Sequence, residues 1–81
     1  MEITLICYAV LKELISEEPF SLEIPEGCTA NQVIELLAQH YPLAAPILKS
    51  TRLAHQENYV DKQSVLCDGE EYCLIPPVSG G

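Results

Sequence analysis

The group with the clearest chemical potential in this chain is the α-carboxylate of its last residue. The chain ends with Ile75, Pro76, Pro77, Val78, Ser79, Gly80 and Gly81. Adjacent prolines favour an extended polyproline II conformation, so residues 76–81 are expected to form an arm on the order of 18 Å long. Glycines have no Cβ atom and can enter a channel that is too narrow for other residues. The pattern predicts that the arm delivers the carboxylate of Gly81 to a buried site on another protein.

A carboxylate is a poor electrophile, so it must be activated before a nucleophile can displace one of its oxygens. The simplest activation is attack on the α-phosphate of ATP, which gives an acyl-adenylate. A sulfur or amine nucleophile can then displace AMP. The chain has no Gly-rich loop followed by Lys-Ser or Lys-Thr, the usual sign of a nucleotide site. We therefore expect that this chain binds no cofactor and that a separate activating enzyme uses the ATP.

The composition limits the kinds of partner. The chain has 81 residues, 48% of them hydrophobic, which suits one domain with one core. Its net charge of −8 is repelled by nucleic acids and anionic membrane surfaces and favours basic protein surfaces. No apolar run approaches the ~18 residues that a membrane span needs. Residues 1–4 lack the basic start of a secretory signal, so a cytoplasmic location is expected.

The cysteines and histidines form no recognisable metal or catalytic motif. The cysteines are Cys7, Cys28, Cys67 and Cys73. No two have zinc-knuckle spacing, so no metal site is expected and the thiols are interpreted as small buried side chains in a reducing compartment. Cys28, in a Gly-Cys-Thr turn, is the one expected to be exposed. His40 and His55 have no serine or cysteine placed by spacing as a catalytic partner, so surface or structural roles are expected.

Hydrophobic patterns predict an α+β fold. Strands are predicted at residues 2–9, 20–24, 52–55, 58–60 and 71–75, with a short helix at 9–16 and a helical turn at 43–50. The main helix begins at Thr29, which can form a capping box with Gln32, and Pro42 ends it. Its apolar residues recur with helical spacing, so this helix is expected to cover the sheet. We predict one domain over residues 1–75, followed by the tail at 76–81.

The first and last strands are apolar on both faces, and only one face can meet the main helix. Ile6, Tyr8 and Leu74 are the candidates for the second face. An exposed apolar patch of this kind is typical of a protein interface. The alternative is that the irregular segment 43–66 covers it.

The end of the chain resembles a known family. An acidic turn at 68–71, a short strand and the ending Pro-Pro-Val-Ser-Gly-Gly resemble the sulfur-carrier small subunits of molybdopterin synthase. The similarity extends more loosely to the rest of the chain, where residues 7–14 resemble the family's strand-to-helix corner. The family's Ala-Val-Asn element is replaced by Ala54, His55 and Gln56.

This resemblance implies a ubiquitin-like β-grasp fold with a mixed sheet. It implies that an adenylyltransferase of the ubiquitin-activating type adenylates Gly81, and that the adenylate is converted to a thiocarboxylate. The tail, residues 76–80, would enter a tunnel in the large synthase subunit, and the sulfur would pass to a cyclic pyranopterin precursor of the molybdenum cofactor. The assembly would hold two small and two large subunits. Catalytic side chains are expected in the large subunit, so this chain would be the sulfur-donating part of a sulfurtransferase complex.

Three other readings of the tail remain open at this stage. The chain could carry sulfur for thiazole synthesis, although that family is typically shorter and usually lacks the Pro-Pro-Val spacer. It could be a ubiquitin-like modifier whose last glycine forms an isopeptide bond. It could also be an interaction module with an inert tail.

Overall fold

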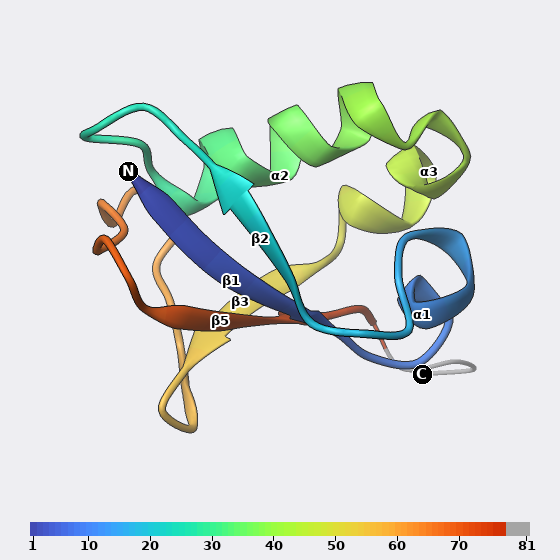
Figure 1. Cartoon of the computed structure of the whole chain (residues 1–81). Coiled ribbons are helices and arrows are strands. Elements are labelled where there is room, and N and C mark those ends of the chain that lie inside the picture. The colour runs from blue at the N-terminus through green and yellow to red at the C-terminus, as the bar shows by residue number, and fades with distance from the viewer. Residues whose placement is uncertain (78–81) are drawn as a thin grey trace.

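Five strands form one mixed sheet in the computed structural model of the chain, which describes residues 1–77 (Figure 1). The strands are β1 (Glu2–Cys7), β2 (Phe20–Glu23), β3 (Arg52–His55), β4 (Asn58–Tyr59) and β5 (Glu71–Ile75). Their order across the sheet is β2-β1-β5-β3-β4. The central pair, β1 and β5, is parallel, and the other pairs are antiparallel. The predicted α+β class is confirmed.

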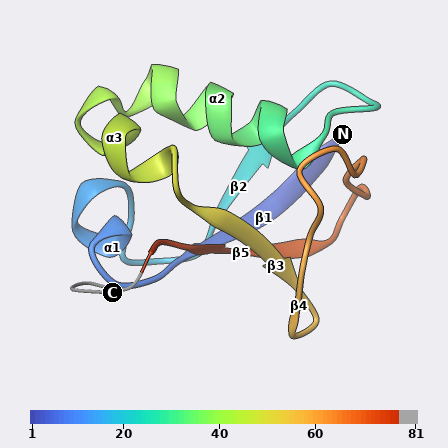
Figure 2. The ribbon, with the colours of Figure 1, turned by 180° about the vertical axis from the view of Figure 1, so that it is seen from behind.

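The helices lie against one face of this sheet. They are α1 (Leu11–Leu14), α2 (Ala30–His40), the 3₁₀ turn η1 (Pro42–Ala44) and α3 (Ala45–Leu48). Figures 1 and 2 show α2 and α3 on the same side of the sheet from opposite directions, with α1 beside the far end of β1. The segment 43–66 therefore supplies α3 to the covered side and β3 and β4 to the sheet itself. It does not cover the second face.

The start of α2 follows directly from two polar side chains. The Gln32 N–H donates to Thr29 Oγ1 at 3.2 Å, and the Thr29 N–H donates to Gln32 Oε1 at 2.9 Å. This is the predicted capping box, which satisfies two backbone donors that a helix start leaves free. The helix then buries Ala30, Val33 and Leu37 against the sheet.

The core lies between the helices and the covered face of the sheet. Its fully buried large side chains are Ile3, Leu5, Leu11, Val33, Leu37, Leu48, Leu53 and Leu74. Each such side chain stabilises the fold by roughly 1.5–3 kcal/mol relative to an exposed one. The parallel β1–β5 pair at the centre contributes residues from both of its strands, so the last strand is an integral part of this core.

The turn that leads into β5 is fastened to the start of β1. The Glu2 N–H donates to Asp68 Oδ1 at 2.8 Å, and the Gly69 N–H donates to the Glu2 carbonyl at 2.7 Å. Gly69 has φ of +82°, a left-handed conformation that glycine adopts without strain. These contacts set where β5 begins and therefore where the chain leaves the sheet.

The prediction that Cys28 is exposed is wrong. Its side chain is 6% exposed, whereas Cys67 is the exposed cysteine. Cys28 is buried because a segment distant in sequence covers it. The Leu66 N–H donates to the Cys28 carbonyl at 2.9 Å, which holds the segment around Leu66 against the turn that contains Cys28. All four thiols are free. Across residues 1–77, no helix has the length and apolar character of a membrane span, and no three potential metal ligands cluster together.

Candidate functional site

The root of the tail is held by neighbours on both sides. At the end of β5, Leu74 is paired with Cys7 of β1 on one side and with Leu53 of β3 on the other. Ile75, the last strand residue, is paired with Arg52. A chain that leaves from the middle of a sheet starts at a fixed point and in a fixed direction. The structure therefore supplies a rigid base for the terminal segment.

The two prolines have different environments, which corrects one expectation. Tyr72 and Leu74 face the core, and Pro76 continues this alternation and is buried. Pro77 is exposed. We expected Pro76 to belong to the projecting arm, but it packs against the body of the domain. The first exposed residue after β5 is therefore Pro77.

The remaining residues of the predicted tail site, Val78, Ser79, Gly80 and Gly81, lie outside the described residues. Their predicted roles, and the existence of a tail separate from the domain, stay predictions. What the structure adds is the place from which these residues start.

The face of the sheet opposite α2 carries a second set of apolar side chains, which we call the open face. It comprises Ile6, Cys73 and Ile75, which are half-buried, and Tyr8, which is 42% exposed. Leu74, predicted to belong to this surface, is instead 0% exposed and lies in the core. Successive residues of a strand point to opposite faces, so its neighbours Cys73 and Ile75 occupy the open face. This face adjoins the root of the tail.

The histidines and acidic residues form no catalytic arrangement with the root of the tail. His40 is exposed at the end of α2, and His55 Nε2 lies 2.7 Å from Glu70 Oε1. The His55 ring also packs 5.0 Å from the Tyr72 ring, measured between centroids. This pair joins β3 to the turn before β5 and is interpreted as a structural contact.

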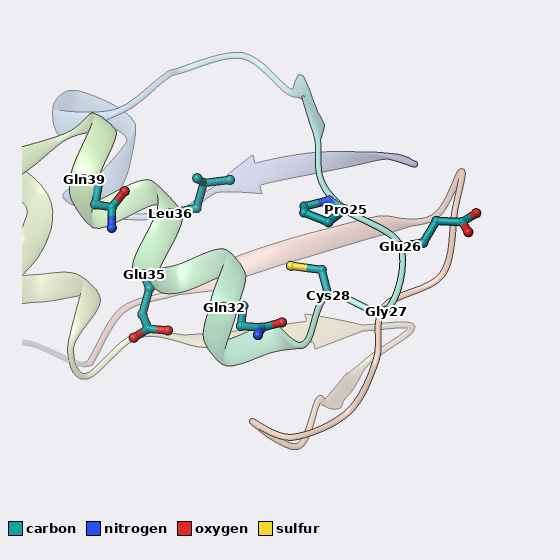
Figure 3. Close-up of a pocket in the computed structure, with 8 residues that line it drawn as sticks. All are labelled: Pro25, Glu26, Gly27, Cys28, Gln32, Glu35, Leu36 and Gln39. Atoms are coloured by element: carbon teal, nitrogen blue, oxygen red, sulfur yellow. The ribbon is translucent and has the colours of Figure 1, made fainter.

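A hollow lies beside α2, next to the turn that precedes it (Figure 3). It has a volume of about 440 Å³ and is open to solvent between the turn at 25–28 and the helix. Its walls carry Glu26 and Glu35 alongside amide side chains, and the Cys28 sulfur points into it. Burial raises the pKa of the Cys28 thiol, so the sulfur stays protonated at neutral pH and is a poor nucleophile. The hollow offers no reactive group for activating the carboxylate.

A mixed five-stranded sheet covered on one face by a main helix, with the chain leaving from a central strand, defines a ubiquitin-like β-grasp protein. The comparison with known families gives the particular assignment. The chain belongs to the ThiS family, whose model matches residues 6–81. This match spans the whole of the terminal segment.

Individual relatives agree with this assignment. The molybdopterin synthase sulfur carrier subunit of Drosophila yakuba is 35% identical over 77 residues, which cover 91% of this chain and 84% of that protein. A solved structure of a putative molybdopterin converting factor, subunit 1, from Pyrococcus furiosus has a TM-score of 0.79 and 20% identity, over 95% of this chain and 98% of that one. The resemblance seen in the sequence and the β-grasp fold that it implied are both confirmed.

A third similarity involves an assembled complex. A structure of the protein–protein complex of subunits 1 and 2 of molybdopterin-converting factor from Helicobacter pylori is matched with a TM-score of 0.68 and 22% identity, over 100% of both chains. At this level of identity the match shows a shared fold.

Proposed function

We propose that this chain is the sulfur-carrier small subunit of a molybdopterin synthase. The observation that carries the proposal is the 35% identity, over 91% of the chain, to a protein of that name. The family match reaches Gly81, so it includes the residues that would react. The chemistry read from the tail, a presented carboxylate that needs outside activation, agrees with this role.

In the proposed reaction, an oxygen of the Gly81 carboxylate attacks the α-phosphate of ATP and pyrophosphate leaves. A sulfur nucleophile then attacks the acyl carbon and AMP leaves, which replaces one C–O bond by a C–S bond. The resulting thiocarboxylate donates its sulfur to a cyclic pyranopterin precursor. An adenylyltransferase of the ubiquitin-activating type performs the first step, and the large synthase subunit supplies the catalytic side chains for the last.

The role of this chain is to hold and present the reacting group. The burial of Pro76 supports an arm of residues 77–81, which would reach roughly 15 Å from the body if fully extended. Gly80 would allow the arm to pass through a narrow tunnel, because glycine has no Cβ atom. The strand pairing of Leu74 and Ile75 resists displacement of the root when a partner pulls on the arm.

The open face is proposed to be the surface that meets the large subunit. It lies next to the root of the tail, so a partner that takes in the arm also reaches Tyr8 and Ile75. A surface of half-buried apolar residues gains stability when a partner removes it from water. The match to a two-subunit complex supports such a partner, and we propose an assembly of two small and two large subunits in the cytoplasm.

Intact mass spectrometry tests the proposal. The chain is incubated with ATP, a matched activating enzyme and a sulfur donor, and its mass should increase by the difference between one sulfur and one oxygen atom. A variant that lacks Gly81 should keep the wild-type fold and show no increase. An unchanged mass for the wild-type chain would exclude a sulfur carrier, and a series of larger protein adducts would favour a modifier. Conversion of the pyranopterin precursor by the loaded chain with the large subunit distinguishes this pathway from thiazole synthesis.

A further inference from the structure

The strand β2 lies at one edge of the sheet. The order β2-β1-β5-β3-β4 makes β2 and β4 the two edge strands, and Figure 1 shows β2 running along the outer side of β1. β4 is only two residues long, whereas β2 has four. An edge strand presents backbone N–H and C=O groups that can pair with a further strand. The orientation of these groups decides whether β2 can do so.

The backbone of Glu23 faces away from β1. Its partner across the two strands is Glu2. The Glu2 N–H donates to Asp68 Oδ1 at 2.8 Å, and the Glu2 carbonyl accepts from the Gly69 N–H at 2.7 Å, so both groups are used on the β5 side of β1. Residues directly opposite each other in an antiparallel pair exchange either both backbone bonds or neither. The N–H and C=O of Glu23 therefore point to the outer edge.

Ser21 is turned in the same direction. It is paired with Thr4, whose N–H donates to the Glu70 carbonyl at 3.0 Å on the β5 side. The alternation is anchored by Met1 and Ile24, which exchange both backbone bonds at 2.7 and 2.8 Å. Both outward-facing residues of β2 are exposed. The edge therefore offers two backbone donors and two backbone acceptors to an extended segment.

A hollow adjoins this edge on the side of the helices. It has a volume of about 300 Å³ and lies between β2 and the last turn of α2. Its lining consists of Phe20, Ser21, Leu22, Leu37, His40 and Tyr41. Phe20 and Leu22 alternate with the outward-facing residues and are half-buried. The side chains of an added strand alternate in the same way, so every second one would lie against this mostly apolar hollow.

The other face of the same edge is acidic. Glu23 lies directly opposite Glu2, and the two side chains share one face of the sheet. In the described part of the chain, neither carboxylate belongs to an ion pair. Like charges directly opposite each other are unfavourable, and a cation beside Glu23 would relieve their repulsion. The exposed Glu17, Glu18 and Glu26 flank β2, so the edge attracts a basic strand and repels the same edge of a second copy.

We propose that the outer edge of β2 is a docking site for an extended segment of a partner protein in which basic and apolar residues alternate. The added strand exchanges backbone hydrogen bonds with Ser21 and Glu23. Its basic side chains lie beside Glu23, and its apolar side chains lie against the hollow. β1 separates this edge from β5, so a partner held here leaves the root of the tail accessible. Docking at this edge does not depend on which group the tail carries.

A peptide titration followed by NMR tests this proposal. The full ¹⁵N-labelled chain is titrated with a capped peptide of sequence Lys-Val-Lys-Val-Lys, whose order is the same from either end and so suits both strand orientations. The amide signals of residues 20–23 should shift, and the affinity should fall as salt is added. Exchange of the Ser21 and Glu23 amide hydrogens with water should slow by about ten-fold or more at saturation. Absence of these effects, or shifts confined to the open face, would overturn the proposal.

Two control peptides separate strand pairing from simple attraction between charges. Asp-Val-Asp-Val-Asp can form the same backbone bonds but carries the wrong charge, and it should not bind. The lysine peptide with every backbone nitrogen methylated keeps its charge but cannot donate backbone hydrogen bonds, and it should not slow exchange at β2. Equal effects of the methylated and unmethylated peptides would contradict pairing at the edge. Signals of residues 20–23 that move with the concentration of the chain alone would show that a second copy occupies the edge, which also contradicts the proposal.

Variants at Ser21 test the outward-facing backbone. Ser21→Pro removes one outward N–H and should weaken peptide binding about ten-fold or more. Proline is tolerated in an edge strand where its nitrogen faces solvent, and the amide spectrum of the variant checks that it is folded. Ser21→Ala keeps the N–H and should bind like the wild type. A folded Ser21→Pro variant with wild-type affinity would refute backbone pairing.

Charge-reversal variants test the acidic face independently of any proline. Glu23→Lys should weaken binding of the lysine peptide roughly ten-fold, because an attractive contact becomes repulsive. Glu57→Lys makes the same change in net charge in the turn between β3 and β4, at the opposite edge of the sheet, and should bind nearly as the wild type does. Equal weakening in the two variants would show that only overall charge matters and would exclude a specific site at β2.

Discussion

The thiol of Cys73 lies 3.7 Å from the hydroxyl oxygen of Tyr8, linking β5 to the corner that follows β1 on the open face. This hydrogen bond is the main cause that raises the pKa of Tyr8, so the phenol remains neutral at physiological pH. Both side chains lie near the place where the chain leaves the sheet. A partner that takes in the tail would therefore meet a neutral phenol beside it, with the Glu71 carboxylate close enough to act on that phenol by charge.

Replacing Tyr8 by aspartate should weaken binding of the large subunit. The change puts a charge into the proposed interface, and we expect the dissociation constant to rise about ten-fold or more, measured by isothermal titration calorimetry. Gln39→Asp adds the same charge on the outer side of α2 and should leave the affinity unchanged. Because Tyr8 is 42% exposed and does not belong to the buried core, its variant should remain folded. An unaltered dissociation constant would rule out the open face as the docking surface.

The two prolines at the root of the tail should differ in their effect on stability. Pro76→Ala has two effects: it removes buried ring atoms, and it raises the conformational entropy of the unfolded chain. The free energy of unfolding should therefore fall by about 1–2 kcal/mol. Pro77→Ala, at an exposed position, loses only the second effect and should cost less than about 1 kcal/mol. Urea denaturation of both variants makes the comparison. Equal losses would contradict the assignment of Pro76 to the body of the domain.

Tyr72 should make the protein less stable in alkali. Burial is the largest cause that raises its pKa, so the phenol ionises at lower pH in the unfolded chain than in the folded protein. Its contribution is fully present below its ordinary pKa of about 10 and is lost as pH rises through the higher folded value. Urea denaturation at a series of pH values should show this decline.

The matched variant for this test is Tyr72→Phe. The Tyr72 hydroxyl accepts the Cys67 N–H at 2.9 Å, so the variant should lose about 1 kcal/mol at neutral pH. Its stability should then fall less steeply above pH 10 than that of the wild type. Burial also raises the pKa of Cys7, so both proteins should share an earlier decline that starts near the ordinary thiol value of about 9. Parallel curves over the whole range would refute a role for Tyr72.

The contribution of the α2 capping box to the stability of the protein can also be measured by urea denaturation. Thr29→Ala removes the acceptor for the Gln32 N–H and should lower the free energy of unfolding by about 1 kcal/mol. Asn31→Ala lies in the same turn, and its side chain is not part of the capping box. This control should stay within about 0.5 kcal/mol of the wild type. A Thr29 variant as stable as the control would mean that the helix start does not depend on the cap.

Local signals in the sequence were sufficient for some features and insufficient for others. The main helix could be predicted because its cap, apolar spacing and terminating proline are all close in sequence. The faces of β5 could not, because Tyr72 and Leu74 are as apolar as Cys73 and Ile75. Alternation separates these two pairs, but it does not say which pair faces the helix. That choice depends on how the whole sheet is placed under α2.

The sequence by itself determined the β-grasp order of elements, the family and the Gly-Gly end, since each can be recognised from residues that are adjacent or close in the sequence. Only the tertiary structure decided that Pro76 belongs to the body and Leu74 to the core. These features depend on β5 entering the middle of the sheet under α2. Contacts between segments distant in sequence create them, and no local pattern encodes such contacts.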